Sequence, residues 1–274
     1  MSRRGTTIGV GLAVGVAALL GLRLMLDENG VNDNTSTGTG SFPHGLAGIW
    51  LQTEWGEPDL AGVWRAAPLG ASSGLDTFDL ATLEELYTPA ARTRIQELSV
   101  EDDPILRCAP PAFPRAAMLG HPIQIIQNPG FTFVLTEAYP VFRTIPTTGR
   151  PHTEAQYLYP TYMGDSTARW EDDTLVVDVT SFNGEGWLAS PEDRPTDASV
   201  GVWPTSDAIH IIERWRRVDA DTLEYQARVE DQHFLEMPWE TPSVIFKRQQ
   251  VDRIEEVFCR PEDGPETYLT RLGE

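Results

Sequence analysis

The clearest pattern in the chain is a series of three paired segments in which apolar and polar residues alternate. They occupy residues 123–136, 167–180 and 209–231, and a short polar turn separates the two members of each pair. In the first pair the turn is Asn-Pro-Gly at 128–130, where Pro followed by Gly suits a type II turn. Alternation with a period of two on both sides of such turns predicts antiparallel hairpins.

The third hairpin is regular enough to predict its pairing residue by residue. Its loop consists of residues 219–221, so Trp215 should face Tyr225 and Glu213 should face Ala227. One face of this hairpin is then apolar, with Glu213 lying within it. The same register places opposite charges side by side at two positions: Arg216 with Glu224, and His210 with Glu230.

Successive hairpins of this kind predict a mainly β fold, either an open sandwich or a closed antiparallel barrel. We favour the β-barrel, because closure removes exposed edge strands and leaves room for a ligand cavity. Leucines at helical spacing predict a helical region within residues 77–98, in which Thr88 and Pro89 suit an N-cap and a first helical position. Residues 251–258 fit either a short helix or a closing strand.

Residues 1–26 carry a targeting pattern, in which two arginines precede an apolar run over 8–22. Such a start is typical of a signal peptide or of an uncleaved N-terminal membrane anchor, and the sequence leaves both open. The positive end should stay in the cytoplasm, so the remainder is expected outside it. Residues 27–45 are polar and small, as in a flexible tether, and residues 46–274 are expected to form one β-barrel domain.

Charge and cysteine content narrow the function classes. The formal net charge of −20 argues against a nucleic-acid partner, which requires a basic patch. It also argues against adhesion to anionic lipid beyond the N-terminal segment itself. The chain has two cysteines, Cys108 and Cys259. Two distant cysteines in an exported chain most often form one disulfide, and we expect that bond here.

Glu213 is the first candidate for chemistry. A carboxylate on an inward face is costly unless it is paired, and desolvation would raise its pKa toward that of a useful general acid or base. Alternatively, Glu213 pairs with an inward arginine such as Arg143 and ties the barrel together. Asp231 falls on the same face. A single bulge would reverse the alternation and bring His210 inward instead.

Three further candidates follow one another along the chain. His152 lies in a turn, where an imidazole can act as a general base near neutral pH or can be a surface residue. Tyr162 belongs to a group of tyrosines that can line a cavity and stabilise a developing oxyanion, or simply form the rim of a barrel. Asp165 can form an acid–base couple with His152 if the intervening chain folds back.

Several motifs are missing from the sequence. It has no Gly-x-Ser-x-Gly, no Walker loop, no dinucleotide-binding glycine pattern after a strand and no His-Glu-x-x-His. The five histidines lack metal-ligand spacing, so we expect neither a catalytic metal nor a cofactor.

Several sequence blocks carry a resemblance to known proteins. They are Pro58-Asp59-Leu60-Ala61-Gly62-Val63-Trp64, Arg107 to Pro111, Gly149-Arg150-Pro151-His152, Arg169 to Asp178, Asp207 to Arg214, and Val257-Phe258-Cys259. With them the chain resembles a large family of exported bacterial proteins of unassigned function, over most of residues 58–260. It departs from the family pattern at Asp165, where that family often has His. The Gly-x-Trp of the first block is also similar to the start of lipocalin-type barrels.

The leading expectation is an envelope-facing, cofactor-free acid–base enzyme, an isomerase, cyclase, hydratase or lyase. Its substrate would be a small, largely apolar organic molecule in the barrel cavity. The candidate catalytic residues, in order, are Glu213, His210, His152, Tyr162, Asp165 and Asp231. The alternatives are a non-catalytic carrier of a lipid-like or pigment ligand in the same cavity, and a structural envelope protein.

Overall fold

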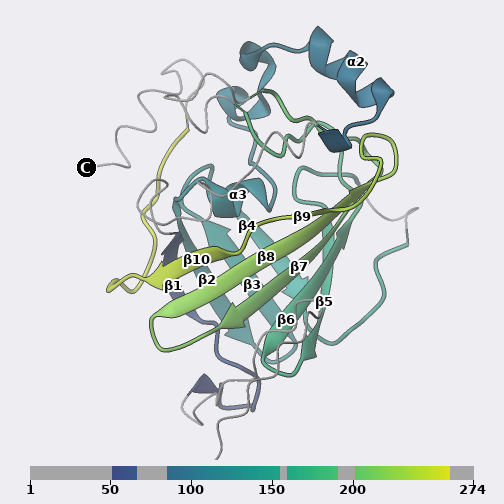
Figure 1. The fold of residues 1–274 in the computed structure, drawn as a ribbon. Coiled ribbons are helices and arrows are strands. Elements are labelled where there is room, and N and C mark those ends of the chain that lie inside the picture. Colours follow the sequence, from purple (N-terminus) through teal and green to yellow (C-terminus); the bar gives the residue numbers. More distant parts are fainter. Residues whose placement is uncertain (1–50, 67–84, 155–158, 191–200, 260–274) are drawn as a thin grey trace, which may run out of the picture. The chain divides into compact units, whose positions relative to one another are not determined.

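The computed structural model describes residues 51–66, 85–154, 159–190 and 201–259 (Figure 1). The chain divides into two compact units, 1–44 and 45–274, and every described residue belongs to the second. The targeting segment 1–26 and the tether 27–45 therefore lie outside the described residues. Among the residues that are described, no helix is long and apolar enough to cross a bilayer.

The fold is a nearly closed antiparallel barrel built from one ten-stranded sheet. Its strands follow the order β4-β3-β2-β1-β10-β8-β7-β6-β5, and β9 pairs with β8. Neighbours in the sheet are thus mostly neighbours in the sequence, and β1 joins the two halves of the sheet by pairing with β10 as well as with β2. The strands are β1 (Gly62–Ala66), β2 (Pro122–Asn128), β3 (Phe131–Thr136), β4 (Val141–Pro146), β5 (Asp165–Glu171), β6 (Thr174–Thr180), β7 (Ile209–Arg217), β8 (Thr222–Asp231), β9 (Trp239–Glu240) and β10 (Val244–Arg248).

The two end strands of the sheet, β4 and β5, contact each other across the remaining seam. The chain that leaves β4 bridges this seam, because the Gly149 amide donates to the carbonyl of Ala168 on β5 at 2.9 Å. Gly149 has a φ of +68°, a left-handed conformation that favours glycine. The backbone then continues over the outer face of β5, where the Thr167 hydroxyl donates to the carbonyl of Arg150.

All three predicted hairpins are confirmed, and the third has the predicted register. In β7–β8, Trp215 faces Tyr225 and Glu213 faces Ala227. Their apolar face is buried, with Glu213 inside it. The two predicted pairs of opposite charge, His210 with Glu230 and Arg216 with Glu224, also lie side by side.

The helices lie near one end of the barrel (Figure 1). Where the chain is described, they include α2 (Pro89–Glu97), α3 (Arg115–Met118) and the 3-10 turns η2 (Val100–Asp102) and η3 (Pro104–Arg107). The predicted start of α2 is confirmed: the Thr88 side chain accepts from the Ala91 amide, and Pro89 follows it. The first part of the predicted helical region, 77–84, lies outside the described residues. Tyr87 joins this end to the barrel, because its buried hydroxyl donates to the carbonyl of Pro204.

The predicted disulfide is confirmed. Cys108 and Cys259 are bonded, with their Cα atoms 5.7 Å apart. The bond joins the turn after η3 to the segment that follows β10. That segment, predicted as a helix or a strand over 251–258, is neither, since it forms bends and irregular structure.

Candidate functional site

Glu213 forms an ion pair with Arg143 in the interior of the barrel. The guanidinium of Arg143 on β4 donates to both carboxylate oxygens, at 2.6 and 2.7 Å, and the Trp215 indole donates to one of them at 2.9 Å. Both charged side chains are buried. Burial alone would lower the pKa of Arg143, but the charge and hydrogen bonds of Glu213 raise it above its usual value. Glu213 is therefore the paired residue that the alternative interpretation described, and we call this the cross-barrel ion pair.

Aromatic side chains fill the space around the cross-barrel ion pair. The Arg143 guanidinium lies over the Phe113 ring at 4.6 Å, and that ring packs edge-on against Trp215 and Tyr225. The pKa of Tyr225 is raised well above its usual value, first by burial and then by the negative charge of Glu213. Because neither Glu213 nor these rings reach solvent, the interior at this level is a packed core.

Asp231, on the same face as Glu213, has a different partner set. Its carboxylate accepts from the amide and the hydroxyl of Ser206 at 2.8 and 2.6 Å, and from the amides of His233 and Phe234 at 3.1 and 3.0 Å. Four hydrogen bonds to a buried carboxylate fix the chain where β8 ends. Asp231 thus organises the turn that follows β8.

Three of the other candidates meet on the outer face of the barrel. His152 Nδ1 lies 2.9 Å from Asp165, and its Nε2 lies 3.0 Å from Oδ1 of Asp178. His210 Nε2 lies 2.8 Å from the same oxygen of Asp178. These side chains, which we call the outer cluster, are about one-seventh to one-third exposed, with relative accessibilities from 14% to 34%.

The strand register explains how the outer cluster forms. Asp178 on β6 and His210 on β7 occupy outward positions of neighbouring strands, because their neighbours Val177 and Ile211 are buried. Asp165 begins β5, next to β6. His152 reaches them because the chain after β4 runs over the outer face of β5.

Both histidines contact carboxylates. A carboxylate only accepts hydrogen bonds, so both nitrogens of His152 donate when the ring is an imidazolium. Partial burial raises the pKa of Asp178, but the hydrogen bonds from His152 and His210 lower it by more, so the net shift is downward. His210 Nδ1 lies 3.6 Å from Glu230, within ion-pair distance when the ring is protonated.

Tyr162 belongs to neither group. Its hydroxyl donates to Glu185 in a short hydrogen bond, and its pKa is raised by partial burial together with the hydrogen bond and the charge of Glu185. Glu185 in turn lines a hollow of about 520 Å³ at the helix-covered end of the barrel, which we call the mouth groove.

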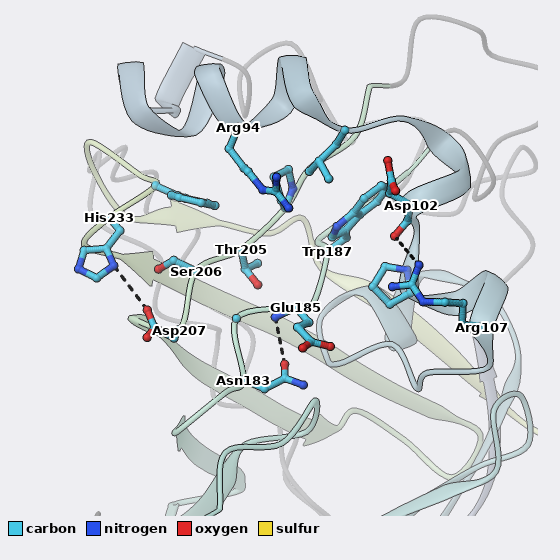
Figure 2. Close-up of a pocket in the computed structure, with 15 residues that line it drawn as sticks. Arg94, Asp102, Arg107, Asn183, Glu185, Trp187, Thr205, Ser206, Asp207 and His233 are labelled. Atoms are coloured by element: carbon cyan, nitrogen blue, oxygen red, sulfur yellow. Dashed lines mark hydrogen bonds and ion pairs between the residues drawn. The ribbon is translucent and has the colours of Figure 1, made fainter.

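The mouth groove combines apolar surface with charges of both signs. Figure 2 shows Arg94 reaching from α2 toward the hollow, with Asn183 and Glu185 on the opposite side. Trp187 contributes aromatic surface to the lining. The remaining lining residues are Leu98, Asp102, Pro104, Arg107, Gly184, Pro204, Thr205, Ser206, Asp207, His233 and Phe234.

The six predicted site residues therefore separate into four places. His152, Asp165 and His210 come together, Tyr162 lies beside the mouth groove, and Glu213 and Asp231 are buried at different levels of the barrel. Asp178, the residue that links the two histidines, was missed. Its outward position follows from the predicted β5–β6 hairpin, so the signal was present in the alternation. Within the described ranges no group of three or more His, Cys, Asp or Glu side chains is arranged to hold a metal ion.

Comparison with known proteins assigns no family. No family model matches the chain, and no curated protein matches it. Among solved structures, it is similar to an abundant heat soluble (SAHS) protein from Ramazzottius varieornatus. The TM-score is 0.34 and the identity 12%, over 72% of this chain and 100% of the other. A similarity at this level says nothing of what the present chain binds or catalyses.

Proposed function

We propose that this protein binds a small organic molecule in the mouth groove. The observation that carries the proposal is the hollow itself, since about 520 Å³ is within the usual size of a small-molecule site. It lies where α2 and the 3-10 turns meet the barrel, in a region built by several separate segments. Small-molecule sites commonly occupy the mouths of β-barrels.

The lining favours an amphipathic ligand. Trp187 and Phe234 offer aromatic surface, while Arg107 and Glu185 offer opposite charges. Such a set can contact a hydrocarbon or ring and also fix polar groups by hydrogen bonds. Because aromatic packing fills the barrel around Glu213, the ligand would lie at the mouth and not beside that carboxylate.

Native mass spectrometry of the full chain, released from its own host's membranes in mild detergent, tests this proposal. We expect a co-purified small molecule on the parent protein. The double replacement Arg107→Gln and Glu185→Gln should lose it, because both side chains line the mouth groove. Arg214→Gln, on the outer face of β7, is the matched control and should retain it. A parent protein without any adduct, or equal loss in the control, would contradict the proposal.

Acid–base catalysis without a cofactor is the second candidate, as an isomerase, cyclase, hydratase or lyase. The specific observation that favours it is the outer cluster, in which a partly exposed His210 lies between the carboxylates of Asp178 and Glu230. Three blocks that carry the family resemblance supply His152, Asp178 and His210. If the molecule identified by mass spectrometry is a substrate, His210→Asn should slow its turnover by about 10²–10⁴-fold without lowering the melting temperature. Unchanged turnover would remove this candidate.

We infer further that residues 1–26 hold the protein at a membrane, with the barrel outside the cytoplasm. The arginine start and apolar run support this, and a disulfide suits an oxidising compartment. The full chain should fractionate with membranes, and external protease added to intact spheroplasts should reach the barrel. Recovery in the cytosolic fraction would contradict both statements.

A further inference from the structure

One outer wall of the barrel is apolar and exposed. Phe142 on β4 is 69% exposed, and Phe131 on β3 and Ile126 on β2 are 43% and 40% exposed. The register places Ile126 beside Phe133, and the Phe131 and Phe133 rings stack at 6.3 Å. We call this surface the apolar wall, formed by Ile126, Phe131, Phe133, Leu135 and Phe142.

The apolar wall contains no charged side chain at any outward position of these three described strands. The outward residues are Pro122, Gln124, Ile126 and Asn128 on β2, Phe131, Phe133 and Leu135 on β3, and Phe142, Thr144 and Pro146 on β4. This absence is local, because the chain as a whole carries a formal net charge of −20 and is 23% charged residues. Exposed apolar surface without charge is typical of an interaction site.

The N-terminal sequence favours one kind of partner. Residues 27–50 separate the apolar N-terminal run from the first described residue, and if the tether predicted within them is flexible, 24 residues span roughly 25–30 Å. The first strand that follows, β1, pairs directly with β2 at one side of the apolar wall. If residues 1–26 lie in a membrane, the tether keeps this wall within reach of the bilayer surface at high effective concentration.

We propose that the apolar wall rests on the surface of the lipid bilayer to which the N-terminal segment attaches the protein, with Phe142 entering the interfacial layer. This inference rests on the proposed membrane attachment and is independent of the mouth groove. The outward positions of β2, β3 and β4 are uncharged, which suits a zwitterionic surface. The negative chain is repelled by anionic lipid, and this includes Asp252 and Glu255 in the segment that hydrogen-bonds Gln124 and Glu137 at the edge of the wall. A second copy is the less fitting occupant. The three most exposed side chains offer about 300 Å², well below the ~800 Å² per partner of a stable interface.

Photo-crosslinking of the full chain in phosphatidylcholine vesicles tests the proposal. Benzoylphenylalanine replaces Phe142, which is 69% exposed and so tolerates the change. The matched control carries the same group at Arg214, an outward position on β7. We expect lipid adducts from position 142 about tenfold above those from position 214. Adding Phe131→Asp to the first variant should sharply reduce them, because it places a charge within the wall.

Each other outcome overturns the inference. Equal lipid adducts at positions 142 and 214 would mean that the wall has no preference for the bilayer. A crosslink from position 142 to a second copy would identify the wall as a dimer interface. Vesicle flotation distinguishes the proposed membrane attachment from the proposed contact of the apolar wall. A chain that does not float lacks the membrane attachment. A chain that floats without lipid adducts at position 142 is attached, but its apolar wall does not contact the bilayer.

Discussion

Glu213 and Asp178 lie on adjacent strands, yet they occupy opposite environments. Val177 pairs with Glu213 across β6 and β7, and Asp178 is the next residue on the other face of the sheet. Glu213 is fully buried against Arg143, whereas the side chain of Asp178 is 34% exposed between two histidines. Successive residues of a strand point to opposite faces of the sheet, so a shift of one position separates the two carboxylates. Glu213 stabilises the fold from inside the barrel, whereas Asp178 on the outer face can take part in proton exchange.

The largest effect should come from breaking the cross-barrel ion pair. Glu213→Gln leaves the Arg143 charge buried without its partner, so we expect the free energy of unfolding to fall by about 3–5 kcal/mol. Urea unfolding followed by circular dichroism measures this loss.

A double replacement sharpens the interpretation. Arg143→Met combined with Glu213→Leu removes both charges and keeps apolar volume, so it should recover much of the stability that Glu213→Gln loses. If Glu213→Gln instead kept full stability while abolishing a measured activity, Glu213 would belong with the catalytic residues and the comparison would fail.

His121 is less buried than Glu213 and more buried than Asp178 of the outer cluster, so its effect on stability should be intermediate. Burial first, and the charge of Arg65 second, lower its pKa from 6.5 to about 4. The unfolded chain therefore binds more protons between about pH 4 and 6.5, and stability should fall as the pH falls through that window. The loss is at most about 3 kcal/mol. Melting temperatures of parent and His121→Asn across this range should differ in slope, and parallel curves would contradict the assignment.

Asp178→Asn should have a smaller effect at neutral pH, about 1 kcal/mol or less, because the pair is partly exposed. The pKa of Asp178 is lowered in the folded state, since the histidine hydrogen bonds outweigh the effect of burial. Its contribution is therefore present above the unfolded pKa, near 4, and is lost as the pH falls below it. The variant should lose less stability than the parent between pH 5 and about pH 3. If the stability of the parent and of the variant fell equally between about pH 5 and pH 3, the outer cluster would make no contribution to the pH dependence of stability.

The smallest effect belongs to the exposed pairs of β8. Arg228 bonds Glu230 and Glu240 at 2.8 and 2.9 Å, but its side chain is 42% exposed. Arg228→Gln should change the free energy of unfolding by no more than about 0.5 kcal/mol, and less in high salt. Urea unfolding at low and high salt measures it. A loss of stability comparable to that of Glu213→Gln would show that burial does not distinguish ion pairs that stabilise the fold from those that do not.

The sequence predicted the local structure well, for physical reasons. Alternation and a short loop determine a hairpin register, so the pairing of Trp215 with Tyr225 followed directly. Arg143 could be named as a partner of Glu213 because both residues occupy inward positions of alternating strands, β4 and β7. The alternation also gives the outward position of Asp178, but nothing in the sequence shows that two histidines from separate segments meet there.

The mouth groove could not be predicted by such reasoning. Its lining comes from α2, the 3-10 turns and loops that follow β6 and β8, which lie up to 140 residues apart between Arg94 and Phe234. Alternation along a strand says nothing of how such loops meet. The outer cluster depends in part on the same kind of information, because His152 arrives on a loop that crosses the seam.

The disulfide has a consequence for the order of events during biosynthesis. Cys259 follows β10, so a ribosome must complete all the strands of the barrel before the second sulfur exists. The covalent bond therefore cannot guide the early pairing of the hairpins, whose partners are close in sequence and can associate on their own. It holds in place a contact between the η3 turn and the segment after β10, both of which must already have been synthesised.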